Sequence, residues 1–573
     1  MIYTTEKIAK IPFRYLPEVF AVDNWESVKA IFDSICENVP QTKDELLDSL
    51  YRYSEISKAL SDELSWKYVH MTVHADDESY AKAYNDFYAN IYAQTEPLRF
   101  KFKELYYQSP AKAELDPSAF DHLNQIISNE IELYREKNIA LRIQESELAN
   151  KYGAVIGSLT AEFDGEERTI SQLSVFLKDP NRGKREAAWH KIFELYNSKK
   201  AYLDSLFDEL KEIRVQIALN AGYPNYRDYM HAEMGRFSYN PADLYNFHQA
   251  VENVVIPFVR ELDEHRRQVL GLEALRPWDV SVDLDGRVLK PFKTTTEFID
   301  KCVKVLGKVN PEYGKQLEMM ANTGLLDLEN RKGKAPGGYN TGINALGSSF
   351  IFMNHVKQHN DVVTLLHEAG HAMHSQAAAP IPIAPYLDTP SEVAELASMT
   401  MELLTMDYWD EFYKKPEDLK KAKRDQLEGA LSFLPWCMIV DAFQHWAYLN
   451  PEHTVAERDQ AYLDIHKRFS TIIDWSDLEH LRKLGWMKQL HIFEVPFYYI
   501  EYGMAQLGAL SIFMNYRKDK AKALQQYQAF LDLGYSAPVS EIYEAAGIKF
   551  DFTESRIREL VDFVKSELQA LDK

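Results

Sequence analysis

The sequence predicts a mainly α-helical protein with a small β element, and three observations support this class. Apolar residues recur at helical spacing through most of residues 1–150 and again from residue 391 to the end. Sequence patterns typical of β-strands are confined to short runs between turn residues. The chain has 573 residues, of which 46% are apolar and 13% aromatic, a composition too apolar for disorder. We expect about two-thirds helix, arranged in several lobes because the chain exceeds one ordinary core.

Composition also limits the partners and the compartment. The net charge of −22 at pH 7 argues against nucleic acid, whose phosphates need basic clusters, and against anionic membrane surfaces. The amino terminus lacks the apolar core of a signal peptide, and the best spanning segment, 430–440, is too short. The 3 cysteines lie far apart, so they indicate neither a disulfide framework nor a thiolate metal site. We expect a cytoplasmic protein without nucleic-acid or membrane partners; the sequence does not indicate an oligomeric state.

The amino-terminal part is expected to be a helical lobe that ends near a hairpin. Thr42 and Glu45 form a capping-box pattern at the start of an amphipathic helix. Further on, residues 158–163 and 166–170 flank an Asp164-Gly165 pair, which predicts a short β-hairpin with a tight turn.

A strand followed by a helix is expected in the middle of the chain. Residues 348–354 are a plausible strand, whose open edge could bind an extended peptide through backbone hydrogen bonds. Asn360 or Asp361 is expected to cap the following helix, at about 361–378. The proline-rich run 379–385 ends that helix.

The helical spacing of apolar residues returns after this break and continues to the end of the chain. Ser391, directly after Pro390, is expected to cap the next helix. The chain ends on an amphipathic stripe at Ile557, Leu560, Val561, Val564, Leu568 and Leu571.

The central helix carries His367-Glu-Ala-Gly-His371, which is a candidate zinc-binding motif. Two histidines four residues apart on a helix lie about 40° apart around its axis, so both can face one metal ion. Glu368 lies beside the first histidine and could act as general base toward a water at the metal. His374 is expected to point away from a shared metal and to have a supporting or structural role.

A third ligand has to come from elsewhere, since a catalytic zinc ion usually has three protein ligands. Residue 377 is Ala, so the longer signature with a third histidine is absent. The helix that begins near Ser391 offers Glu392, Glu395 and Glu402. Glu392 and Glu395 are one turn apart and could both face the metal helix, so spacing alone does not choose between them.

A later segment places several phenols on one helix face. Tyr499 and Tyr502 are three residues apart, and Tyr498 and Tyr502 are four apart. A phenol or an imidazole N–H could stabilise the oxyanion of a tetrahedral intermediate. Tyrosines at a wet helix interface are the alternative interpretation, because Tyr suits such surfaces.

Several of these motifs together resemble the thimet-oligopeptidase/oligoendopeptidase F family of zinc metallopeptidases. The histidine motif is followed by Ala394-Glu-Leu-Ala-Ser398, as in that family. Residues 331–339 and 350–354 resemble the strand region beside the family's active site, and residues 491–502 resemble its substrate-contacting segment. The resemblance spans roughly residue 170 to the carboxy terminus and is weakest in the amino-terminal lobe.

The resemblance implies roles for individual residues. It selects Glu395 as the third zinc ligand, beside His367 and His371. The remaining implied site residues comprise the catalytic group Glu368, His491, Tyr499 and Tyr502, and the substrate-binding group Gly338, Tyr339 and Tyr498.

The family also implies a fold and an activity. We expect a multilobed helical ellipsoid with a deep substrate channel and a small β-sheet beside the zinc helix. Its domains would be an amino-terminal lobe, 1–170, and a catalytic body, 171–573. With one Zn²⁺ per chain it would hydrolyse internal bonds of short oligopeptides by a metal-activated water, with Glu368 as general base. A helical zinc carboxypeptidase that trims peptide ends is the alternative enzyme, and a non-catalytic peptide-binding protein is the alternative outside enzymes.

Overall fold

The computed structural model describes residues 8, 10–17, 21–331, 333–335 and 337–573. The chain is 71% helical, so the predicted mainly α class is confirmed. It forms two compact units, each built from three separate segments. Unit 1 comprises Met1–Tyr134, Leu289–Lys423 and Gly508–Phe550, and unit 2 comprises Arg135–Val288, Arg424–Leu507 and Asp551–Lys573. The domain division at residue 170 stays a prediction.

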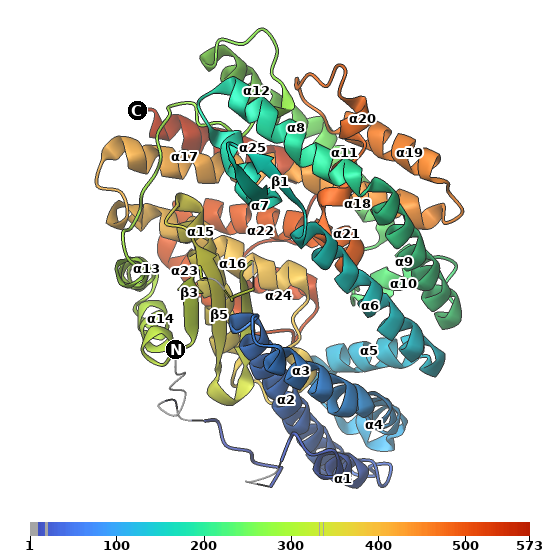
Figure 1. Cartoon of the computed structure of the whole chain (residues 1–573). Coiled ribbons are helices and arrows are strands. Elements are labelled where there is room, and N and C mark those ends of the chain that lie inside the picture. Colours follow the sequence, from blue (N-terminus) through green and yellow to red (C-terminus); the bar gives the residue numbers. More distant parts are fainter. Residues whose placement is uncertain (1–7, 9, 18–20, 332, 336) are drawn as a thin grey trace. The chain divides into compact units, whose positions relative to one another are not determined.

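Unit 1 contains a three-stranded sheet (Figure 1). Most of the helices of this unit come from the amino-terminal and central parts of the chain. Its strands are β3 Leu326–Glu329, β4 Tyr339–Ile343 and β5 Ser348–His355. Its helices are α1 Trp25–Ile35, α2 Lys43–Val73, α3 Glu78–Phe87, α4 Glu96–Gln108, α5 Pro117–Leu133, α13 Thr295–Val309, α14 Pro311–Asn322, α15 His359–Ala378, α16 Ser391–Thr405, α23 Lys520–Leu531 and α24 Val539–Ala545.

Unit 2 is helical apart from one hairpin, β1 Thr160–Phe163 and β2 Glu166–Thr169. Its helices are α6 Glu136–Gly157, α7 Ile170–Val175, α8 Arg182–Ser198, α9 Lys200–Ala221, α10 Tyr226–Glu233, α11 Pro241–Ala250, α12 Ile256–Val269, α18 Leu434–Leu449, α19 Val455–Arg468, α20 Glu479–Arg482, α21 Leu490–Glu494 and α25 Glu554–Leu571. Two further helices pass from one unit's segments to the other's, α17 Pro416–Ser432 and α22 Tyr499–Lys518.

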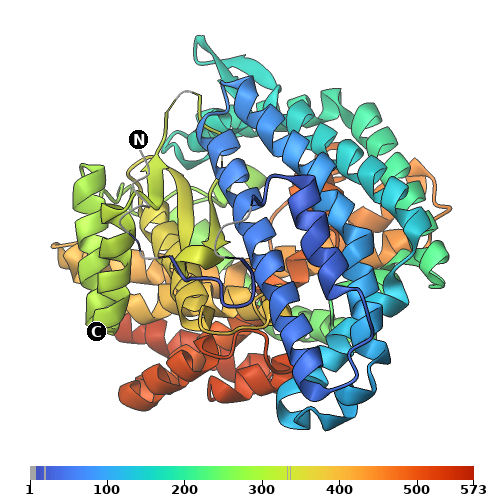
Figure 2. The ribbon, with the colours of Figure 1, turned by 90° about the horizontal axis from the view of Figure 1, so that it is seen from below.

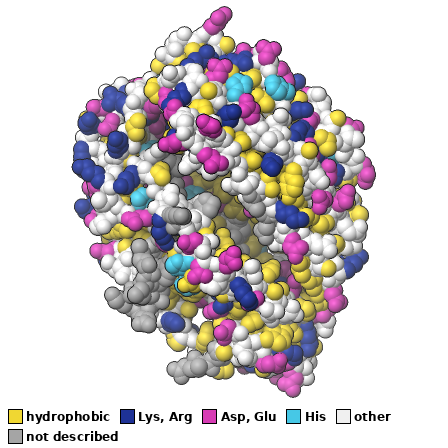
Figure 3. Space-filling view, in the orientation of Figure 1, with side chains coloured by type: hydrophobic (Ala, Val, Ile, Leu, Met, Phe, Trp, Pro, Cys, Tyr) yellow, Lys and Arg dark blue, Asp and Glu magenta, His cyan; other side chains and the backbone are white. Residues whose placement is uncertain are grey.

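Charged side chains are distributed over the surface. On the face seen in Figure 3, acidic and basic side chains are interspersed. Among the described residues, no helix has both the length and the apolar character that crossing a bilayer requires.

The predicted amino-terminal helix and the predicted hairpin are both confirmed. Thr42 Oγ1 accepts the backbone N–H of Glu45, and the Glu45 carboxylate accepts that of Thr42, which completes the capping box of α2. β1 and β2 pair antiparallel across Asp164 and Gly165, whose φ values of 57° and 78° form the tight turn.

The sheet of unit 1 has the strand order β3-β5-β4. The predicted strand at 348–354 is therefore real, but the open edge predicted for it is wrong. β5 pairs in parallel with β3 and antiparallel with β4, where Tyr339 lies opposite Phe352, so β5 is the central strand and β3 and β4 are the two edges. Helix α2 packs beside β4, as Figure 2 shows, and the hydroxyls of Thr341 and Ser65 lie 3.0 Å apart.

Both predicted helix caps in the middle of the chain are wrong by a short distance. Helix α15 begins at His359, with Gln358 as its N-cap, because the carboxylate of Asp361 reaches back 2.7 Å to the backbone N–H of Gln358. Helix α16 begins at Ser391 itself and is preceded by Pro390 as N-cap, without a side-chain cap. The carboxy-terminal stripe forms α25 as predicted, and its residues up to Leu568 are buried.

Helices α15 and α16 pack unusually closely where they pass each other. A Cβ atom at Gly370 would lie 2.6 Å from the Cα of Ser398 and 2.9 Å from the carbonyl oxygen of Ala397. Both neighbouring atoms belong to the backbone of α16, so no side-chain rotation can make room. Glycine at this position therefore fixes the distance between the two helices.

Gly370→Ala should destabilise the protein by about 1–3 kcal/mol, since the added methyl group forces the two backbones apart. Chemical denaturation of both variants measures the effect against Gly429→Ala, a matched control in α17 with nothing within 4 Å of the added atom. The control should gain about 0.5–1 kcal/mol, because alanine favours a helix interior over glycine. Equal stability of the two variants would contradict the close contact.

Candidate active site

Three predicted metal ligands come together at the contact between α15 and α16. His367 and His371 lie one turn apart on α15, with ring centroids 4.9 Å apart. Glu395 Oε2 on α16 lies 3.3 Å from His367 Nε2 and 3.6 Å from His371 Nε2. Within the described part of the chain, these three are the one group of His, Cys, Asp and Glu side chains placed to share a metal ion.

Neighbouring side chains fix the orientation of these three groups. The carboxylate of Glu402 accepts a hydrogen bond from His367 Nδ1 at 2.7 Å, which directs the Nε2 atom toward Glu395. The hydroxyl of Ser398 donates to Glu395 Oε2 at 3.1 Å. Two imidazole nitrogens and one carboxylate oxygen are the donor set that zinc takes in catalytic sites, so the residues present fit this metal.

The side chains of this cluster shift one another's pKa values. Burial lowers the pKa of His367, but hydrogen bonds to Glu395 and Glu402 outweigh burial and hold it well above its usual range. Burial also lowers the pKa of His371, to about 4. The pKa of Glu395 falls to about 2, because contact with the two histidines outweighs the opposing effect of its burial. A positive charge located between the carboxylates and the imidazoles of this cluster is therefore stabilised.

Glu368 is buried next to the first histidine. Burial raises its pKa to about 7; His367 opposes this rise, and the charges of Glu395 and Glu402 add to it. Its backbone carbonyl accepts a hydrogen bond from Asn340 Nδ2 at 3.2 Å, which ties α15 to the edge strand β4. A carboxyl group with a pKa near neutrality can both take up and release a proton.

Two other residues considered from the sequence lie outside this cluster. Glu392 is buried at the start of α16, where its backbone carbonyl accepts a hydrogen bond from the Tyr543 hydroxyl at 2.8 Å. His374 is buried against Phe530, at a centroid distance of 5.5 Å, and burial lowers its pKa to about 3. The positions of both residues agree with a supporting role rather than with the role of a metal ligand.

The predicted substrate-binding residues Gly338 and Tyr339 lie at the start of the edge strand. The Tyr339 hydroxyl forms a 2.6 Å hydrogen bond with Thr72 of α2, and its ring stacks on Phe352 at 4.8 Å. A Cβ atom at Gly338 would lie 3.3 Å from the carbonyl oxygen of Phe352. These contacts hold both residues beside β5, the strand that comes directly before α15 in the chain.

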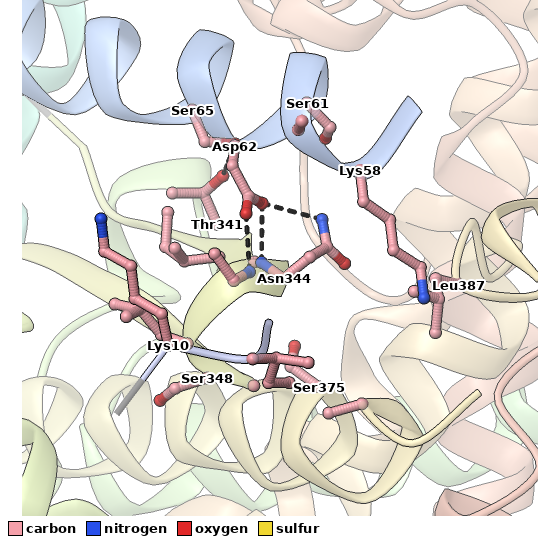
Figure 4. A pocket seen from close by; sticks show the side chains of 18 of the residues that line it. Lys10, Lys58, Ser61, Asp62, Ser65, Thr341, Asn344, Ser348, Ser375 and Leu387 are labelled. Carbon is pink, nitrogen blue, oxygen red and sulfur yellow. Dashed lines mark hydrogen bonds between the residues drawn. The ribbon is translucent and has the colours of Figure 1, made fainter. Parts of the chain in front are cut away.

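A cavity of about 540 Å³ lies in unit 1, between α2, the turn after β4 and the carboxy-terminal half of α15 (Figure 4). Ser375, one turn after His371, lines it on the α15 side. On the opposite side, Asp62 accepts hydrogen bonds from the backbone N–H groups of Asn344 and Ala345, both at 2.6 Å. The sequence did not predict this cavity, because its walls come from four parts of the chain that are distant in sequence, namely residues 10–13 with 22, 55–66, 341–348 and 374–389.

The predicted His–Tyr segment belongs to unit 2, and the structure brings its aromatic residues together. The ring of His491 lies 4.9 Å from that of Tyr499, 5.9 Å from Tyr498 and 6.0 Å from Tyr502. The rings of Tyr498 and Tyr502 are 5.3 Å apart. Burial raises the pKa of Tyr499, so this phenol stays protonated.

Two buried arginines, which the sequence analysis missed, hold this segment. Arg214 on α9 donates to the carbonyl oxygens of Ile492 and Phe493. Arg236 donates to the carbonyl of Phe497 and to the carboxylate of Glu501, at 2.6 and 2.8 Å.

A sequence signal for Arg214 did exist. It falls on the same helical face as four apolar residues that the structure buries, so a charge appears where the pattern calls for a core residue. These apolar residues are Leu203, Phe207, Leu210 and Ile217.

The chain is similar to known peptidases over most of its length. The model of "Peptidase family M3" matches residues 175–562, and that of "Peptidase M3 N-terminal domain" matches residues 18–134. An oligoendopeptidase F homolog of Borreliella burgdorferi is 25% identical, over 77% of this chain and 76% of that protein. Oligopeptidase PepF of Bacillus subtilis is 23% identical, over 93% of this chain and 83% of that protein.

Among solved structures, PZ peptidase A with inhibitor 2 superposes with a TM-score of 0.89 at 28% identity. The match covers 97% of this chain and 99% of that one. The first family model alone spans more than half of the 573 residues. The chain therefore belongs to peptidase family M3, in its oligoendopeptidase F-like branch, and is a metalloendopeptidase.

Proposed function

We propose that this chain hydrolyses internal bonds of short peptides with one zinc ion held by His367, His371 and Glu395. The observation that supports this most is the convergence of two imidazole Nε2 atoms and one carboxylate oxygen beside the buried Glu368. When bound, zinc supplies a Lewis acid that polarises the scissile carbonyl and makes water more acidic.

In this proposal the protein's own residues carry the proton and the developing charge. The Glu368 carboxylate takes a proton from the attacking water and gives it to the nitrogen of the leaving amine. Its raised pKa suits both steps, because neither transfer is strongly uphill near neutral pH. The N–H of His491 and the hydroxyl of Tyr502, with Tyr499 in support, are the proposed donors to the oxyanion of the substrate.

Gly338, Tyr339 and Tyr498 are proposed to contact the bound peptide. The edge position of β4 supports this role for the first two, because an edge strand offers unpaired backbone groups to an extended chain. The cavity that Ser375 lines adds space for peptide side chains next to α15, the helix that carries His367 and His371.

Glu368→Gln should keep the metal and lose a factor of about 10²–10⁴ in kcat, since the amide cannot accept a proton. Metal content and kcat measured on the same preparation separate the two effects. Unchanged turnover would eliminate Glu368 as the base.

Substitutions of the three glutamates on α16 should affect zinc affinity to different degrees. Glu402→Gln should cost about 10–100-fold, because it only orients His367, and Glu395→Gln should cost more, because it removes a ligand. Glu392→Gln is the matched control one turn away on α16 and should leave the affinity unchanged. Competition with a chromogenic chelator measures all three, and full zinc retention in Glu395→Gln would point to Glu392 instead.

Peptides blocked at both ends should be cleaved internally, and the rate should fall as the substrate grows toward a folded protein. The names of the oligopeptidase relatives support this size limit. Mass spectrometry of the products locates the cleaved bonds, and a chelator should abolish all of them. Trimming from one end only would favour a carboxypeptidase, and efficient digestion of a folded protein would contradict the size limit.

A further inference from the structure

Two hydrogen bonds connect a tryptophan to the ring of His491 within unit 2. The indole N–H of Trp436, on α18, donates to Gln489 Oε1 at 2.8 Å. The other side of the same amide faces the imidazole, with Gln489 Nε2 lying 2.6 Å from His491 Nδ1.

The chemistry of these three groups permits only one arrangement of protons. An indole N–H can only donate, so it requires the amide oxygen of Gln489 and thereby settles which way the amide points. The amide nitrogen, which also only donates, must then face a nitrogen that accepts. His491 Nδ1 is consequently unprotonated, and the ring proton is on Nε2. An imidazolium would bring two N–H donors face to face.

We propose that Gln489 is a positioning residue that holds His491 as the neutral imidazole with its proton on Nε2, the form that donates to a substrate oxygen from that atom. This inference rests on the donor role of His491 proposed above. The opposite tautomer would present a lone pair at Nε2, which would repel an oxyanion instead of stabilising it.

The first member of this chain of hydrogen bonds is itself held in place. The ammonium group of Lys488 lies 4.4 Å above the ring of Trp436, in a cation–π contact. Nearby, the Tyr152 hydroxyl of α6 donates to the carbonyl of Met487 at 2.9 Å. The residues on both sides of Gln489 are therefore anchored, together with Ile492 and Phe493 through Arg214.

Three tyrosines contact His491, and other titratable groups lie on the elements that carry or anchor this segment; the chemistry of all of them differs from that of Gln489. Phenols lose their protons only near pH ~10, and burial raises the pKa of Tyr499 and Tyr152 further. Burial lowers the pKa of Lys488 and raises that of Glu494. These groups are Tyr498 in the turn before α22, Tyr499 and Tyr502 on α22, Tyr152 on α6, Lys488 before α21 and Glu494 on α21.

The tautomer can be read directly from the full-length, metal-loaded protein labelled with ¹⁵N-histidine. A long-range ¹H–¹⁵N correlation spectrum distinguishes the two tautomers and the imidazolium, and His491→Leu identifies the signal by its loss. Between pH 7 and 8 the wild type should show the proton on Nε2. Gln489→Glu should show it on Nδ1 or on both nitrogens, because a carboxylate accepts from both Trp436 and His491.

The pH profile of kcat/KM then connects the tautomer to activity. In Gln489→Glu the carboxylate favours the imidazolium, which still donates from Nε2, and moves its deprotonation to higher pH. The neutral ring formed there keeps its proton on Nδ1, so kcat/KM should fall by about 10²–10³ as the pH rises. Gln489→Met, which has similar length but neither hydrogen bond, is the control and should lose activity without gaining this alkaline limb.

Two results would overturn the inference. One is a wild-type spectrum with the proton on Nδ1 or with the imidazolium at pH 7–8. The other is a Gln489→Glu profile with the same shape as the wild type, while His491→Leu is strongly impaired. Full activity of His491→Leu would instead remove the donor role from the proposed function, and the spectrum would still decide what Gln489 does to the ring.

Discussion

The close contact between α15 and α16 is the constraint on which the cluster of His367, His371 and Glu395 depends. Gly370 lets the backbone of one helix approach the Cα of Ser398 on the other, at a distance that any side chain would increase. A carboxylate side chain is short, so Glu395 reaches the two histidines only because the helices are this near. Ser398 has a second role there, since its hydroxyl also donates to Glu395. Helix packing and the geometry of this cluster are thus set by the same few residues.

Three carboxylates near the cluster differ in chemistry because their surroundings differ. Glu395 faces two imidazoles and is held ionised, with its pKa lowered to about 2. Glu368 is buried, which raises its pKa to about 7 although His367 opposes the rise. Glu402 orients an imidazole through its Nδ1 atom. Environments that push the pKa values of neighbouring carboxyl groups apart are characteristic of acid–base catalysis.

The aromatic segment of unit 2 is held by a different device. Arg214 and Arg236 are buried, and they use their N–H groups on backbone carbonyls of residues 492–497 rather than on a ligand. A buried guanidinium needs several acceptors, so it fixes every carbonyl that it contacts. This explains how a short, irregular stretch of chain can hold His491 in one orientation. Gln489 then adds what the arginines cannot provide, a fixed position for the ring proton.

Patterns that depend on near neighbours in sequence were predictable from the sequence alone. The pairing of His367 with His371, the capping box at Thr42 and the hairpin at Asp164-Gly165 follow from helix period and turn chemistry, which act over a few residues. Choices between equivalent neighbours depended on distant parts of the chain. Examples are the position of Glu395 rather than Glu392 beside the two histidines, and of β4 rather than β5 at an edge of the sheet. Each choice is made by segments brought close only by folding, such as Ser398 against Gly370 or β4 against β5, and local spacing carries no information about such contacts.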